Sequence, residues 1–110
     1  MALEPSVPPV NVYEGNRQLS VAVPIPGAHR EHVELRLTPT RLRLRAECKY
    51  EQEHQRYLRR EWQVGSWEVD VPLPEAVDPA SARAALRHGV LIVMAPLSTA
   101  EQGESRVTVE

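Results

Sequence analysis

Short segments in which apolar and polar residues alternate recur along most of the chain. The clearest are residues 33–37 (VELRL), 42–46 (LRLRA) and 67–73 (WEVDVPL). A period of two is typical of strands that bury one face. Weaker examples at residues 10–13 and 19–23 end at turn residues or prolines, as strands commonly do. The pattern therefore predicts an all-β chain.

Two segments depart from this alternation. Residues 90–94 are five consecutive apolar residues, which favours a strand buried on both faces. Residues 78–86 read DPASARAAL, and an Asp followed by Pro predicts the start of a short helix. The same small residues also suit a strand at residues 82–86, so the residues alone leave both alternatives open.

The two ends of the chain differ from its middle. Residues 1–9 contain three prolines and no periodicity, and we expect an extended N-terminal arm. Residues 98–110 form a polar tail that we expect to be disordered in isolation, with Val-Thr-Val near its end. Between them, residues 10–97 predict one domain. Seven to eight short strands without a long helix predict an immunoglobulin-like antiparallel β-sandwich.

Composition restricts the classes of function. The chain has 110 residues, 42% hydrophobic and 25% charged, which fits one soluble globular domain. A net charge of −2 argues against a nucleic-acid partner. No apolar run approaches the roughly 18 residues that span a bilayer, and no secretory signal opens the chain. One cysteine excludes an internal disulfide, so we expect a cytoplasmic location.

The chemistry of an enzyme is missing from the sequence. The five glycines form no phosphate-binding loop, and nothing assembles a nucleophile with a base and an oxyanion donor. Cys48 beside Lys49 is a weak candidate for a reactive thiol; we expect a strand residue without a chemical role. We expect no catalytic residue, no cofactor and no metal site. The histidines lack ligand spacing and are expected on the surface: His29, His32, His54 and His88.

Residues 89–96, read GVLIVMAP, resemble the signature of the alpha-crystallin domain. Other pieces resemble that family in the same order: VPIPG, HVELRL, LRLRAE and REWQVGSWEVDVPLPEAVD. Two positions depart from the family pattern, because Val69 and Leu97 stand where the family usually has basic residues; this puts the usual interface charges in doubt. The signature positions are Ala84, Gly89, Val90, Leu91, Val93 and Pro96.

The resemblance implies a small heat-shock protein of the bacterial or plant type. Such a protein would act in the stress response as an ATP-independent holdase chaperone. Its partners would be unfolding client proteins and further copies of itself, without a cofactor. The alternative is a co-chaperone or adaptor similar to CS domains, which share the sandwich but dock on a folded partner. That alternative predicts a monomer that does not suppress aggregation.

The resemblance also makes the tail a candidate binding segment. Val107 and Val109 match the family's C-terminal triplet of two β-branched residues. In an extended segment their side chains point the same way and can fill adjacent pockets beside an edge strand. The alternative is a frayed tail that happens to hold two valines. The family places the receiving groove at Val33, Leu35, Leu37, Ala82 and Ala84, which are otherwise plain core positions.

Residues 51–61 are polar and charged, and resemble the long loop of bacterial and plant members. That loop would contribute a strand to a partner subunit and so cover an unpaired edge. A mobile solvated loop is the alternative. With a short arm that lacks aromatic residues, we expect small oligomers, mainly homodimers. The predicted exchanged strand consists of Tyr57, Leu58, Arg59, Arg60 and Glu61.

Overall fold

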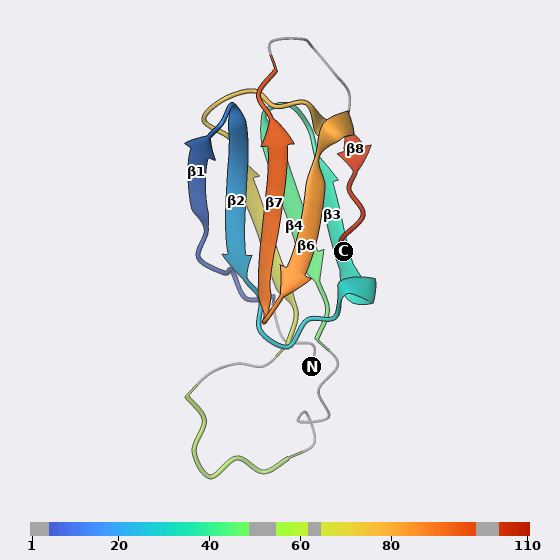
Figure 1. Cartoon of the computed structure of the whole chain (residues 1–110). Coiled ribbons are helices and arrows are strands. Elements are labelled where there is room, and N and C mark those ends of the chain that lie inside the picture. Colours follow the sequence, from blue (N-terminus) through green and yellow to red (C-terminus); the bar gives the residue numbers. More distant parts are fainter. Residues whose placement is uncertain (1–4, 49–54, 62–64, 99–103) are drawn as a thin grey trace.

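The chain folds into two four-stranded antiparallel sheets packed face to face, as Figure 1 shows. The structure is a computed structural model that describes residues 5–48, 55–61, 65–98 and 104–110. The strands are β1 (Asn11–Gly15), β2 (Gln18–Pro24), β3 (Val33–Leu37), β4 (Arg41–Ala46), β5 (Trp67–Pro72), β6 (Arg83–Arg87), β7 (Val90–Pro96) and β8 (Ser105–Arg106). The predicted all-β sandwich is therefore confirmed.

The strand order brings together segments that are far apart in the sequence. One sheet has the order β1-β2-β7-β6, and the other has the order β5-β4-β3-β8. Strands β1 to β5 follow the alternating segments of the sequence closely, with shifts of one or two residues at their ends. Strands β6 and β7 fall on the two segments that depart from alternation. Because β3 and β6 lie toward the same side of the sandwich in Figure 1, the edges of the two sheets approach each other there.

Alternation along each strand builds the core between the sheets. In β4 every second residue is buried, and the intervening arginines face solvent. Burial of apolar side chains on this scale is the main force that holds two sheets together. The buried hydrophobic residues form one continuous cluster: Leu19, Val21, Val23, Ile25, Leu35, Leu37, Leu42, Leu44, Ala46, Val71, Val77, Ala84, Leu91, Val93, Ala95 and Val107.

Two hairpins are closed by two-residue turns with positive φ. Asn16 and Arg17 join β1 to β2 with φ of 53° and 59°. His88 and Gly89 join β6 to β7 with φ of 52° and 78°. Positive φ at both central positions matches the right-handed twist of the flanking strands. At Gly89 a side chain would also meet the Pro26 backbone, 3.4 Å from the added Cβ.

The segment that the sequence left open contains both a helical turn and a strand. A 3-10 turn, η2 (Pro79–Ser81), is capped by Asp78, whose side chain accepts a hydrogen bond of 3.1 Å from the Ala80 backbone N–H. Strand β6 begins two residues later. A second 3-10 turn, η1 (Arg30–His32), precedes β3. Neither helical turn in the described part of the chain is long or apolar enough to cross a bilayer.

Strand β7 differs from its sequence-based interpretation. Its apolar run predicted burial on both faces, but only the face toward the other sheet is fully covered. Leu91 and Val93 are buried there, whereas Ile92 is half-buried and Met94 is 38% exposed on the opposite face. An apolar run shows that a strand favours burial but does not show which neighbour covers it. Within the described residues, the other sheet covers the inner face of β7, and the outer face stays partly exposed.

The N-terminal arm, expected to be extended, is attached to the edge of β5. Ser6 forms a parallel bridge with Trp67. The Ser6 N–H donates to the Ser66 carbonyl at 2.9 Å, and the Glu68 N–H donates to the Ser6 carbonyl at 3.0 Å. The arm therefore covers part of one sheet edge and leaves Val7 largely in solvent.

Candidate functional site

The five predicted groove residues lie together, on the facing edges of the two sheets. Val33, Leu35 and Leu37 belong to β3, while Ala84 belongs to β6 and Ala82 directly precedes it. The side chains of Leu35, Leu37 and Ala84 are buried, and the other two are half-buried against the same core. These positions are thus core residues whose strands also form the two walls of a seam.

The tail of the same chain fills this seam and pairs with both walls. Strand β8 pairs antiparallel with β3, and the Val107 N–H donates to the Leu35 carbonyl at 3.1 Å. The chain then crosses to β6, where the Glu110 N–H donates to the Ala84 carbonyl at 2.8 Å. The Leu86 N–H in turn donates to the Glu110 carbonyl at 2.7 Å. In Figure 1 the C-terminus accordingly lies beside β6 and β3.

The two valines of the tail point into the seam, and the threonine between them points out. Val107 is 7% exposed and belongs to the core cluster, while Val109 is half-buried and packs against it. Thr108 is exposed. This is the same-side placement that a period of two requires of an extended segment.

Charged side chains border the docked tail, and the sequence reasoning did not single them out. The Arg36 guanidinium lies 3.3 Å from the Glu104 carboxylate and 3.0 Å from that of Glu34. Arg106 approaches Glu34 at 3.6 Å. The hydrogen bond from Arg36 is the main reason that the pKa of Glu34 lies below its ordinary value. The alternating charged residues of VELRL and ESRV could have predicted these ion pairs between β3 and the tail.

Residues 55–61 lie away from the sandwich and form no strand within the chain. Leu58 is 88% exposed and Tyr57 is 42% exposed. Within the segment, the Arg60 guanidinium carbon lies 5.1 Å from the centre of the Tyr57 ring, and Arg59 pairs with Glu61 at 2.6 Å. The predicted exchanged strand is therefore an exposed segment with a bend at Leu58, and its pairing with a partner stays a prediction.

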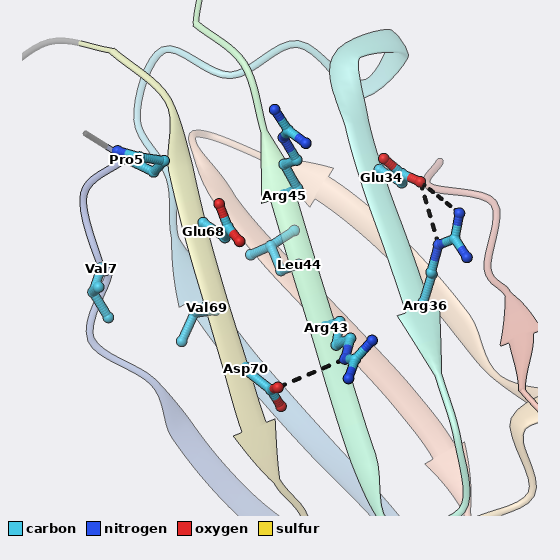
Figure 2. A pocket seen from close by; sticks show the side chains of 10 residues that line it. All are labelled: Pro5, Val7, Glu34, Arg36, Arg43, Leu44, Arg45, Glu68, Val69 and Asp70. Carbon is cyan, nitrogen blue, oxygen red and sulfur yellow. Dashed lines mark hydrogen bonds and ion pairs between the residues drawn. The ribbon is translucent and has the colours of Figure 1, made fainter. Parts of the chain in front are cut away.

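The outer face of the β3-β4-β5 layer carries charge instead of apolar groups. Figure 2 shows a hollow over this face, bordered by the N-terminal arm at Pro5 and Val7. Asp70 accepts a hydrogen bond of 2.7 Å from Arg41 and lies 3.6 Å from Arg43. Ion pairs this exposed contribute little to stability, so the face is best described as solvated.

The remaining candidates for chemistry stay isolated. The Cys48 thiol lies 3.7 Å from the Pro26 carbonyl, and burial raises its pKa above the ordinary value, which makes it less nucleophilic. Lys49, its proposed activating neighbour, lies outside the described residues, as does His54. The His29 and His32 rings meet edge to face at 6.2 Å. Among the described residues, no three His, Cys, Asp or Glu side chains gather to hold a metal ion.

Comparison with solved structures finds several similar chains. One is HspA from Xanthomonas axonopodis, with 28% identity and a TM-score of 0.76 over 88% of this chain and 99% of that one. Another is a small heat-shock protein from Xylella fastidiosa, with 26% identity and a TM-score of 0.75 over 91% and 94%. Heat shock protein 16.0 from Schizosaccharomyces pombe also has 26% identity and a TM-score of 0.75, over 89% and 71%.

A comparison with curated proteins finds no match. The family model described as Hsp20/alpha crystallin matches residues 11–110, which include β1 to β8 and the docked tail. This match agrees with the signature at Gly89 to Pro96, now placed in the β6–β7 turn and in β7. The chain therefore belongs to the Hsp20/alpha crystallin family of small heat-shock proteins.

Proposed function

We propose that this protein is an ATP-independent holdase chaperone that binds unfolding proteins in the cytoplasm and limits their aggregation. The observation that carries the proposal is the apolar seam between β3 and β6, filled by a short tail of the same chain. A client segment with suitable apolar side chains could replace the tail and make the same backbone hydrogen bonds. Such binding removes aggregation-prone chains from solution without bond-making chemistry, as the family implies for a protein that is not an enzyme.

The strength of tail docking suits reversible exchange. Burial of two valine side chains contributes about 3–4 kcal/mol before the cost of ordering the segment. The ion pairs of Arg36 and Arg106 beside the tail are exposed and add little. The net affinity is therefore modest, and an unfolding client present in excess can compete for the seam.

We further infer a homodimer formed by strand exchange. The segment containing Tyr57 and Leu58 is exposed, and among the described strands β1 pairs only with β2. An open strand edge in one copy and an exposed segment outside the sandwich of another are complementary, since that segment can add a strand to the edge. In a two-fold dimer, each copy would pair its segment with the β1 edge of the other copy, and no such edge would be left for a third copy.

The tail can be tested with a matched pair of substitutions. Val107→Asp places a carboxylate in the seam, whereas Thr108→Asp adds the same charge at an exposed position. We expect the wild type to suppress aggregation of a thermally unfolding client without nucleotide. We expect that less V107D than wild-type protein is needed per client molecule for equal suppression, because the seam is then open. T108D should match the wild type. A wild type that leaves client light scattering unaltered would contradict the proposal, and with a monomeric mass it would favour an adaptor instead.

The dimer is tested separately by light scattering after size exclusion. We expect a mass near twice the 12.4 kDa of one chain. Leu58→Asp should shift the population toward the monomer, while Gln55→Asp, exposed in the same segment but outside residues 57–61, should not. Equal behaviour of both variants would refute exchange through this segment and would leave the holdase proposal untouched.

A further inference from the structure

The outer face of the β1-β2-β7-β6 sheet is almost free of charge. Residues that alternate with the buried ones face outward, and the register aligns them in rows across the sheet. Arg83 and Arg87 are the charged residues in these rows, both on the edge strand β6, and no carboxylate occupies an outward position. The rows are Gly15, Gln18 and Pro96; Tyr13, Ser20, Met94 and Arg83; Asn11, Ala22, Ile92 and Ala85; and Pro24, Val90 and Arg87.

This face contrasts with the outer face of the other sheet. There, β4 presents three arginines, as expected of a sheet that is solvated on one side. Figure 2 shows two of them, Arg43 and Arg45, beside Glu68 and Asp70 of β5. On the first sheet the described residues leave Tyr13 53% and Met94 38% exposed. Strand β7 thus has the composition of a strand covered on both sides, but its second cover is absent from the described chain.

The size of the face argues against a second copy as its occupant. Four strands about 4.8 Å apart and a seven-residue strand rising about 3.3 Å per residue give roughly 440 Å². Two such faces would bury about 900 Å² in total, less than the 1,200–2,000 Å² typical of stable interfaces. A small apolar surface suits weak and reversible contact with a segment that exchanges readily.

We propose that this outer face is a second docking surface for extended apolar segments of unfolding client chains, separate from the seam between β3 and β6 that holds the tail. The proposal rests on the holdase function proposed above. The interior strands β2 and β7 are paired on both sides, so the face offers side chains and few free backbone groups. Recognition would therefore depend on apolar character and not on sequence.

The side chains present fit such an occupant. Small residues at Ala22 and Ala85 leave the middle of the face shallow, so that a client side chain can lie across it. The unbranched thioether of Met94 adapts to different shapes. At the β6 margin, Arg83 and Arg87 would favour client segments with acidic flanks and disfavour basic ones.

The test compares Met94→Glu with Thr40→Glu. Both add one negative charge at an exposed position, but Thr40 lies in the turn before β4, on the other sheet. We expect M94E to need about tenfold more protein for equal suppression of client aggregation, because a carboxylate must be desolvated under the client. T40E should match the wild type. Equal suppression by M94E and wild type would overturn this surface and leave the holdase proposal standing, whereas an inactive wild type would refute the holdase itself.

A second measurement covers the case in which M94E fails to fold. A photoreactive benzoylphenylalanine replaces Met94, or Arg43 on the charged face as a control, in the otherwise intact chain. The probe is lactalbumin held unfolded by reduction and carboxymethylation. We expect cross-links to lactalbumin from position 94 and not from position 43. Cross-links only between copies of the chain, or equal labelling from both positions, would overturn the proposal.

Discussion

Substitution of Val107 by Ala should loosen the tail without unfolding the sandwich. Val107 is 7% exposed, so almost the whole side chain is withdrawn from water when the tail docks. Removing the equivalent of two methylene groups weakens docking by about 1.6 kcal/mol at 0.8 kcal/mol each. Such a change shifts the equilibrium between docked and open tail about 15-fold toward the open form.

Amide hydrogen exchange measures this opening residue by residue. The N–H groups of Val107, Glu110 and Leu86 are hydrogen-bonded through tail docking, with donor–acceptor distances of 2.7–3.1 Å. In V107A these amides should exchange about 15-fold faster, since local opening limits their exchange. Central amides such as that of Val93, between β2 and β6, should keep their protection. The exposed control Thr108→Ala should leave all of these rates unchanged.

One pattern of rates would refute this reasoning. If V107A accelerated exchange equally at Leu86 and at Val93, the tail would open only with the whole domain. Val107 would then be a fixed part of the core, and a client could not displace the tail without unfolding the chaperone. The holdase mechanism through the seam would have to be abandoned.

Two further predictions concern a turn and a pair of acids. Gly89→Ala should lower the free energy of unfolding by about 1–2 kcal/mol in urea titrations, because a side chain at φ 78° strains the backbone. Gly15→Ala, with open space around the added Cβ and no positive φ, should change it by less than about 0.5 kcal/mol. Hydrogen bonding and repulsion with Glu14 raise the pKa of Glu75, so the folded state holds that proton more tightly and stability falls as pH rises through the glutamate range. Glu75→Gln should therefore raise Tm at about pH 7 and leave it unchanged at about pH 3; a rise at both would show another cause.

Periodicity sufficed to predict most of the strands but not how they close. The alternation in VELRL and LRLRA predicts β3 and β4 directly, because a strand with one buried face must repeat every two residues. The segment around Asp78 stayed ambiguous, since small residues suit a helical turn and a strand alike. The structure contains both, with the Asp78 side chain capping a single turn before β6 begins.

The groove residues came from a family resemblance, since local sequence does not encode which edges meet. Leu35 and Ala84 are almost fifty positions apart, and each looks like an ordinary core residue in its own strand. Only the packing of the two sheets brings β3 and β6 close enough for one tail to pair with both. The charges of Glu34 and Arg36 likewise acquire a role only when Glu104 and Arg106 arrive beside them.

The sequence by itself determined strands β1 to β5 and the face that each of them buries, because alternation depends on neighbours a few residues away. The tertiary structure alone decided what lies against each face. It seats Val107 in the seam of its own chain and leaves the outer side of β7, apolar throughout, without a cover among the described residues. A hydrophobic pattern shows which side chains are more stable away from water, but burial of apolar surface is non-directional. Which residues cover those side chains is therefore determined only when the sheets pack.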